Sequence, residues 1–404
     1  MRRPTMTDFS SKATNAVRAS IESDTQFGAV VPPLHLSSNY TFAAFGEPRQ
    51  YDYTRSGNPT RDALGDALAE LEGGAGAVVT ASGMGALTLL TQFLRPGDTI
   101  IAPHDCYGGT YRLFEQQSLK GLFDVEFVDQ TDLATLRAVC ERVRPKMILT
   151  ESPSNPLLRI ADLGAIRELA TVCGALFAVD NTFLSPALQN PIAFGADLVV
   201  HSTTKYINGH SDVVGGAVVA ATAELAEQCA YWANVIGITG APFDSFMTLR
   251  GLRTLHPRIR QHEESACLIA NVLSEQANVT RVYYPGLEDH EGHSLARKQQ
   301  RGFGGMVSFE IDGGEASVRS FVESLRYFSL AESLGGVESL VCHPASMTHA
   351  PVSAERKAAA GVTPSLLRLS VGLESPDDLV EDVLAALDAA TRAPQLKAVA
   401  TGGC

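Results

Sequence analysis

Short apolar runs that alternate with amphipathic stretches limit the fold of this chain more than any other feature of its sequence. Between residues 77 and 220 these runs are rich in valine, isoleucine and leucine, and polar and apolar residues do not alternate within them. Such runs suit strands that are covered on both faces. They lie at residues 77–80, 99–102, 125–128, 147–150, 176–179, 198–200 and 216–220. The stretches between them predict helices at residues 83–94, 111–119, 133–142 and 163–173, and a short one near Ala187. This alternation predicts an α/β domain with a mostly parallel sheet and helices on both faces.

The N-terminal segment predicts an arm in front of this domain. Residues 1–70 are rich in Ser, Thr, Asn, Pro and Gly, which is typical of an extended segment with little core of its own. Such an arm is stable only if it packs on a larger body, and we expect that body to be a neighbouring subunit. A helix is expected at residues 59–72, closed by Gly73 and Gly74. The large domain then spans residues 71–265.

A smaller α+β domain is expected at residues 266–404. One long helical region, at residues 242–273, leads into it. The later patterns predict strands at 279–284 and 306–311, helices at 316–325 and 376–391, and a frayed tail from residue 394.

Charge and cysteine content exclude several classes of function. The net charge of −13 argues against a surface for nucleic acid or an anionic membrane, either of which needs a basic footprint. No apolar run approaches the length of a membrane span, so we expect a soluble, cytoplasmic protein. The 7 cysteines show neither CxxC nor Cys/His ligand spacing, so we expect reduced thiols and no metal site. His35 and His210 also lack ligand spacing and are interpreted as hydrogen-bonded loop residues.

Lys205 is the strongest candidate for covalent chemistry. It follows the run at 198–200 closely, and Ser202, Thr203 and Thr204 lie between them. In open α/β sheets, ligands bind outside the carboxyl ends of the strands. A lysine amine there can react with a carbonyl cofactor such as pyridoxal phosphate. Taken alone, a lysine in such a loop is more often an exposed surface residue, so the hypothesis depends on other motifs.

A glycine-rich turn supports a phosphate site. Ala81-Ser-Gly-Met-Gly85 stands between the first strand of the domain and its first long helix, where backbone amides can hold a phosphate group. The alternative is a turn that only begins a helix. The turn fails as a dinucleotide fingerprint because Thr88 occupies the third glycine position, which disfavours a nicotinamide dehydrogenase.

Three further features, which comprise four residues, fit the same cofactor. Asp180 ends a buried strand, where its carboxylate could pair with a pyridinium nitrogen, and a right-handed crossover would bring it to the sheet edge of Lys205. Tyr107 follows another strand and could stack on a flat ring or act as an acid or base. In the arm, Tyr53 and Arg55 point the same way in extended backbone and could clamp phosphate oxygens. The alternatives are a helix cap, a loop tyrosine and a solvated arm.

Six segments, spread over nearly the whole chain, resemble a known family. They are Val30-Val-Pro-Pro-Leu-His-Leu36, Ala102-Pro-His-Asp-Cys-Tyr-Gly-Gly109, Glu151-Ser-Pro-Ser-Asn-Pro156, Asp180-Asn-Thr-Phe-Leu-Ser-Pro-Ala-Leu188, the stretch 201–212 and Ala331-Glu-Ser-Leu-Gly-Gly-Val-Glu-Ser339. Through these segments the chain resembles the cysteine and methionine metabolism family of pyridoxal-phosphate enzymes, the trans-sulfuration enzymes. The resemblance implies an aminotransferase type I fold and a homotetramer of two tight dimers with shared active sites.

The resemblance also implies roles for individual residues. Lys205 would bind the cofactor covalently, Asp180 would pair with its pyridine nitrogen, and Tyr107 would stack on the ring and deprotonate the incoming amine. The phosphate would be held by Gly83, Met84, Ser202 and Thr204 of one subunit and by Tyr53 and Arg55 of its neighbour. Arg368 and Ser333 would bind the substrate α-carboxylate, with Asn155 near the cofactor's 3-hydroxyl and Glu332 beside the substrate.

Within the family, the chain resembles most the branch that catalyses γ-replacement. This implies that an O-acyl homoserine, with the O-succinyl ester favoured, reacts with L-cysteine to form L-cystathionine for methionine biosynthesis. β-Lyases tend to carry an aromatic residue in place of Glu332, and methionine γ-lyases a cysteine in place of Gly109. Cystathionine γ-lyase or O-acylhomoserine sulfhydrylase activity on the same scaffold is the alternative. Ser56 replaces a second arginine of some synthases, which leaves the choice between succinyl and acetyl esters open.

Overall fold

The large domain is built on a mostly parallel sheet, as the sequence predicts. The computed structural model describes residues 11–350 and 353–400, with side chains up to residue 392. Its 7-stranded sheet has the order β1-β7-β6-β5-β4-β2-β3, and only β7 runs antiparallel to its neighbours. The strands are β1 (Gly76–Thr80), β2 (Thr99–Pro103), β3 (Asp124–Val128), β4 (Met147–Glu151), β5 (Leu176–Asp180), β6 (Leu198–His201) and β7 (Gly216–Ala220).

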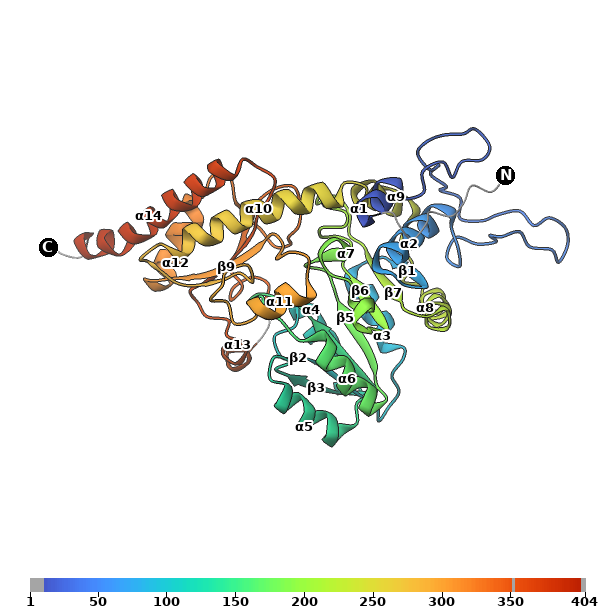
Figure 1. Cartoon of the computed structure of the whole chain (residues 1–404), viewed down its shortest axis with the longest axis horizontal. Helices are drawn as coiled ribbons and strands as arrows, with labels where there is room; N and C mark the ends of the chain where they lie inside the picture. The colour runs from blue at the N-terminus through green and yellow to red at the C-terminus, as the bar shows by residue number, and fades with distance from the viewer. Residues whose placement is uncertain (1–10, 351–352, 401–404) are drawn as a thin grey trace.

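Helices cover both faces of this sheet (Figure 1). Phe177 and Val179 of β5 pack into the core on one face, and Ala178 packs into the core on the other. The central strands are therefore buried on both sides, which explains their continuous apolar runs. Helices α2 (Pro59–Glu72), α5 (Leu133–Val143), α6 (Leu163–Cys173), α7 (Ser185–Leu188) and α9 (Pro242–Leu252) contribute to the first core, and α3 (Gly83–Thr91), α4 (Gly108–Leu119) and α8 (Ala223–Ile236) to the second. A short 3-10 helix, η1, spans Pro191–Phe194.

The second domain has a sheet and a core of its own. Its 5-stranded sheet has the order β10-β11-β12-β9-β8. The strands are β8 (Val279–Tyr283), β9 (Met306–Ile311), β10 (Ser329–Leu330), β11 (Leu340–Cys342) and β12 (Leu366–Ser370). The helices are α10 (Leu255–Ser274), α11 (His293–Gln299), α12 (Gly314–Ser324), α13 (Ala354–Ala360) and α14 (Pro376–Ala400). The sequence predicts a frayed tail from residue 394, whereas α14 continues to Ala400.

The long helical region between the domains is two helices rather than one. Arg258 donates to the carbonyl of Gly251 at 2.8 Å, the acceptor that the N–H of Leu255 would use in a continuous helix. Helix α9 therefore ends at Leu252, and α10 begins at Leu255 after a turn at Thr254. The start of α10 packs into the large-domain core through Leu255 and Ile259, and its later part packs into the second core. Helix α10 thus joins the two domains (Figure 1).

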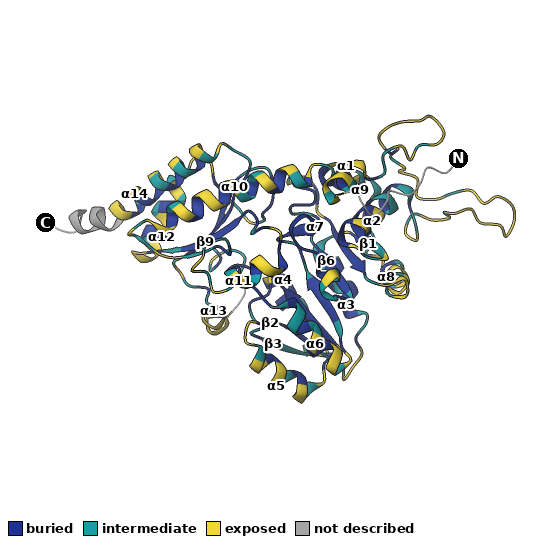
Figure 2. Cartoon of the chain, in the orientation of Figure 1, coloured by how far each residue is buried: buried dark blue, intermediate teal, exposed yellow. Residues whose placement is uncertain are grey.

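The arm is extended but contains a helix that the sequence analysis missed. Helix α1 (Lys12–Arg18) buries Ala16 in the large-domain core, and Ala19 just beyond its end is buried there too. This helix depends on packing against α2 rather than on a strong pattern of its own. Most of the arm up to residue 57 is exposed (Figure 2), including Phe27 and Phe45. The first ten residues of the predicted arm lie outside the described part of the chain.

The described residues bear on three features of the chain: membrane-spanning helices, metal-binding groups and the state of the cysteines. None of the described helices is long and apolar enough to cross a membrane. Within residues 11–350 and 353–400 there is no group of His, Cys, Asp and Glu side chains that could hold a metal ion. The six described cysteines are all free thiols.

A buried carboxylate ties helix α2 to the ends of β5 and β6. Glu72 Oε1 accepts a hydrogen bond from Asn181 Nδ2 at 2.7 Å and lies 2.7 Å from His201 Nε2. Glu72 Oε2 accepts from Asn190 Nδ2 at 3.1 Å. All four side chains are buried, so this network fixes the strand ends that face the candidate site.

We predict that Glu72→Ala destabilises the fold. The substitution leaves His201 Nε2 buried without its partner and removes one of two acceptors from each of Asn181 and Asn190, which should lower the free energy of unfolding by about 3 kcal/mol. Differential scanning calorimetry would show this as a lower unfolding temperature. Glu70→Ala, at an exposed position of the same helix, is the matched control and should behave like the unchanged protein. Equal unfolding temperatures for the two variants would contradict the assignment.

Candidate active site

A pocket of about 370 Å³ lies at the carboxyl ends of β4, β5 and β6. The large domain supplies most of its wall, and the second domain supplies Arg368 from β12 and the segment 332–334. Most of the site residues predicted from the sequence line it. They are Gly83, Met84, Tyr107, Asn155, Asp180, Ser202, Thr204, Lys205, Glu332, Ser333 and Arg368. The structure therefore brings together residues from nearly the whole length of the chain.

Lys205 projects into this pocket from the loop that follows β6. Its Nζ donates a hydrogen bond to Ser333 Oγ at 2.7 Å. Burial, assisted by the positive charge of Arg368, lowers the pKa of Lys205 to about 8. A larger fraction of the amine is therefore uncharged near neutral pH than for an exposed lysine, which suits a nucleophile or a base.

Two carboxyl groups lie side by side at the ends of β4 and β5. Glu151 and Asp180 are paired residues in the parallel ladder. Burial raises the pKa of both groups, and Asp180 adds to the increase for Glu151. Asp180 Oδ1 also accepts a hydrogen bond from the Thr182 backbone at 2.9 Å. Asp180 is thus available to pair with a cationic ring nitrogen, whose positive charge would favour its ionised form.

The sequence analysis missed Glu151 and Thr182 as pocket residues. Glu151 had a usable signal, because it ends a buried strand as Asp180 does. Thr182 Oγ1 accepts a hydrogen bond from the Ser202 backbone at 2.9 Å and so joins the loops after β5 and β6. No sequence spacing indicates this contact, because the two loops meet only in the folded sheet.

The glycine-rich turn closely approaches the lysine loop. Ser82 caps α3, and its Oγ accepts from the Gly85 backbone at 3.0 Å. A Cβ atom on Gly83 would lie only 2.8 Å from Ser202 Cβ. The Thr204 hydroxyl donates to the carbonyl of Gly215 at 3.1 Å and accepts from its N–H at 2.9 Å. Donation to a phosphate oxygen would therefore require the Thr204 hydroxyl to leave the Gly215 carbonyl.

Arg368 forms the opposite side of the pocket. Its side chain is 2% exposed, and Nη1 donates to Asn155 Oδ1 at 2.6 Å while Nη2 donates to the Ser333 carbonyl at 3.0 Å. Its buried Nε has no partner among the described residues. A guanidinium held in this way and left with free donor capacity suits a ligand carboxylate.

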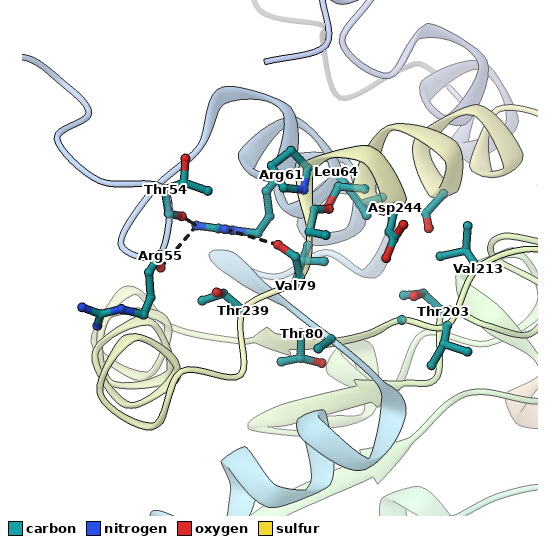
Figure 3. A pocket seen from close by; sticks show the side chains of 18 of the residues that line it. Thr54, Arg55, Arg61, Leu64, Val79, Thr80, Thr203, Val213, Thr239 and Asp244 are labelled. Carbon is teal, nitrogen blue, oxygen red and sulfur yellow. Dashed lines mark hydrogen bonds between the residues drawn. The ribbon is translucent and has the colours of Figure 1, made fainter. Parts of the chain in front are cut away.

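Tyr53 and Arg55 do not line the Lys205 pocket of their own chain. They border a second hollow, of about 360 Å³ (Figure 3), in which Arg61 donates to the Thr54 carbonyl at 2.6 Å. Arg55 points toward α8, where its Nη1 donates to Asn234 Oδ1 at 2.6 Å. Their predicted contact with a neighbouring subunit stays a prediction. His210, in contrast, is hydrogen-bonded within its loop, through Nδ1 and the Asn208 carbonyl at 2.8 Å.

The chain is similar in sequence and structure to known enzymes. The profile of Cys/Met metabolism PLP-dependent enzymes matches residues 13–388. The chain is 55% identical to cystathionine γ-synthase of Escherichia coli over 373 residues, which cover 92% of this chain and 96% of the relative. A crystal structure of cystathionine γ-synthase from Xanthomonas oryzae pv. oryzae in complex with cystathionine matches with a TM-score of 0.94 and 61% identity, over 95% of this chain and 99% of that one. A cystathionine β-lyase of Lactococcus lactis subsp. cremoris is 45% identical over 94% of this chain and 100% of its own length.

The groups in the pocket fit pyridoxal phosphate. The buried amine of Lys205 suits the aldehyde, and the carboxyl group of Asp180 suits the ring nitrogen. Gly83 stands at the start of α3 with no room for a side chain beside Ser202, and backbone amides at a helix start suit a phosphate group. These are the chemically distinct parts of the cofactor, and each has a matching group in one pocket.

We predict that Gly83→Ala weakens cofactor binding. A Cβ at this position would push against Ser202 and open the turn, so the dissociation constant for pyridoxal phosphate should rise at least about 10-fold. Equilibrium dialysis of the apoprotein measures this constant.

Gly85→Ala is the matched control for this substitution. The atoms nearest to a Cβ on Gly85 would lie 3.5 Å away, an ordinary contact distance, so the affinity should change little. A similar effect of the two substitutions would contradict the assignment of Gly83.

Proposed function

Because this chain belongs to the Cys/Met metabolism family, it is a pyridoxal-phosphate-dependent enzyme with the aminotransferase type I fold, and we propose that it acts as a cystathionine γ-synthase. The proposed reaction joins the γ-carbon of an O-acyl homoserine, with O-succinyl homoserine favoured, to the sulfur of L-cysteine. The products are L-cystathionine and the free acid, and the role is in trans-sulfuration toward methionine. The observation that carries the proposal is the meeting of Lys205, Asp180 and Arg368 in one pocket.

The cofactor supplies the electron sink and the carbonyl group with which the substrate amine reacts. We assign binding of the substrate α-carboxylate to Arg368, with Ser333 assisting. Asn155, which accepts from Arg368 at 2.6 Å, would keep the guanidinium directed toward the carboxylate. Asp180 would keep a proton on the ring nitrogen, and Gly83, Met84, Ser202 and Thr204 would hold the phosphate.

γ-Replacement requires two proton abstractions before the Cγ–O bond can break and the acyloxy group can leave as the free carboxylate. A proton must leave Cα, and a second must leave Cβ, after which the γ-substituent departs and the thiol sulfur of cysteine bonds to Cγ. We assign deprotonation of the incoming amine to Tyr107 and the later proton transfers to Lys205. Lys205 suits this role because burial lowers its pKa to about 8, so that it can both accept and return protons near neutral pH.

Glu332 is our candidate for discrimination among related reactions. It lines the pocket beside Ser333, where its carboxylate would contact a polar second substrate. The similarity to cystathionine γ-lyases favours a second candidate function, which is γ-lyase activity at the same residues. O-acylhomoserine sulfhydrylase activity on the same scaffold is the other alternative.

The assembly is the remaining part of the proposal. We propose an arm at residues 1–70, a large domain at 71–265 and a C-terminal domain at 266–404. Two such chains would form a tight dimer in which Tyr53 and Arg55 reach the neighbour's cofactor phosphate, and two dimers would form a homotetramer that works in the cytoplasm. The exposed aromatic residues of the arm support a surface that another chain covers.

A product assay tests the proposed reaction. With O-succinyl homoserine and L-cysteine, we expect cystathionine and succinate to form in equal amounts. With the ester alone, we expect slower elimination to an oxo acid and ammonia. Mass spectrometry of the products separates these reactions, and sulfide or cystathionine as the only partner tests the sulfhydrylase and the lyase. Absence of cystathionine from the complete mixture would refute the proposal.

Hybrid dimers test the shared site. Lys205→Ala and Arg55→Ala should each reduce activity when expressed alone. In a hybrid dimer of the two variants, one site lacks both side chains while the other retains both, so co-expression should restore activity. The measurement is the rate at limiting pyridoxal phosphate, after removal of the homodimers by two affinity tags. If Arg55 acted within its own chain, no site would be intact and no activity would return.

A further inference from the structure

The site contains a buried carboxyl group that the proposed reaction does not use. Glu151 ends β4, is 8% exposed and lines the Lys205 pocket. Its Oε2 accepts a hydrogen bond from the backbone N–H of Tyr107 at 3.0 Å, and its Oε1 accepts one from the backbone N–H of Asn155 at 3.0 Å. We propose that Glu151 is a positioning residue that holds Tyr107 and Asn155 in the orientation that the proposed γ-replacement requires.

Tyr107 depends on this contact for its position. It stands at the start of α4, makes no side-chain cap to that helix, and is 40% exposed. Its ring passes so close to Gly109 that a Cβ there would lie 2.4 Å from Cε1. A small rotation of the Tyr107 backbone would therefore move the ring against the chain or away from the pocket. The bond to Glu151 fixes the backbone from which the ring projects.

Asn155 extends the influence of Glu151 to the substrate carboxylate. The Asn155 side chain accepts from Arg368 Nη1 at 2.6 Å, so an amide held by Glu151 in turn holds the guanidinium. The carboxyl group of Glu151 thus connects Tyr107, which is expected to stack on the cofactor ring, with Arg368, which is expected to bind the substrate α-carboxylate. Sequence spacing does not reveal the bond between Glu151 and Tyr107 or the bond between Asn155 and Arg368, because each joins segments that are far apart in the chain. The bond between Glu151 and Asn155 is local.

Glu151 does not have to be charged to accept the hydrogen bonds from the backbone N–H groups of Tyr107 and Asn155. Burial, together with the neighbouring Asp180, raises the pKa of Glu151 well above its usual value. A protonated carboxyl group retains acceptor capacity on both oxygens. Glu151 can therefore hold both N–H groups while Asp180 carries the negative charge that pairs with the ring nitrogen.

If Glu151 only held the two loops together, Asp105 would have the same role. Asp105 joins the same two loops from outside the pocket, since its Oδ2 accepts from Ser154 Oγ at 2.6 Å and from Arg159 Nη1 at 3.0 Å. It is buried like Glu151 but does not line the Lys205 pocket. Asp105→Asn is therefore the matched control for loosening of these loops without loss of the contacts to Tyr107 and Asn155.

The test compares Glu151→Gln with this control in the holoenzyme. Glutamine keeps the shape but turns an NH2 group toward one of the two N–H donors, so one bond is lost. We expect kcat with O-succinyl homoserine and cysteine to fall about 100-fold. Amide hydrogen exchange should rise about 10-fold at Tyr107 or Asn155, and the visible circular dichroism of bound pyridoxal phosphate should change. Glu151→Asp, which keeps two acceptor oxygens on a shorter side chain, should give intermediate values and covers the case in which the glutamine variant does not fold.

Asp105→Asn should leave kcat within about threefold and the circular dichroism unchanged, since it makes no contact with the pocket. Glu151→Gln with unchanged kcat and dichroism would overturn the proposal, as would an equal loss of kcat in Asp105→Asn. The inference rests on the proposed γ-replacement only for its kinetic measurement. If the unchanged enzyme formed no cystathionine, the proposed function would fail, while the exchange and dichroism measurements would still decide the role of Glu151.

Discussion

The removal of ionisable groups from water at one sheet edge is the constraint on which the site depends. Lys205, Asp180, Glu151 and Arg368 are all largely buried there, and an isolated buried charge is strongly unfavourable. The chain reduces this cost by placing the groups near one another and by directing backbone N–H and carbonyl groups at them. The same burial lowers the pKa of Lys205. The lowered pKa of the lysine is thus a consequence of its place in a pocket that both domains line.

Much of the fold could be predicted because its causes are local in sequence. Polar and apolar residues do not alternate in the strands around residues 177 and 199, because helices cover both faces of the sheet. This pattern can be recognised from the sequence alone. The break between α9 and α10 was not predictable in this way. It depends on the side chain of Arg258, which donates to Gly251 and also to the carbonyl of Tyr206, far away in sequence. Helix α1 was missed for a similar reason, since α2 supplies its packing surface.

The residues of the candidate site also differ in whether a local sequence signal could reveal them. Lys205 and Asp180 could be found because each follows a recognisable strand, and parallel strands bring their carboxyl ends together. Arg368 has no such local signal, and only the family resemblance assigned it. Thr182 was missed because its partner Ser202 belongs to another loop, and Glu151 was missed because its partner Tyr107 also belongs to another loop. Only the bond from Glu151 to Asn155 is local in the sequence. Tyr53 and Arg55 lie outside the Lys205 pocket of their own chain, since the expected partner of each is a second copy.

Helix α10 has one end in each hydrophobic core. A rotation of one domain against the other would have to bend this helix or withdraw apolar side chains from a core, and either would be unfavourable. Helix α10 therefore fixes the separation between Lys205, in the loop after β6, and Arg368, in β12. With this separation fixed, the pocket favours ligands whose two polar ends stand at one particular spacing.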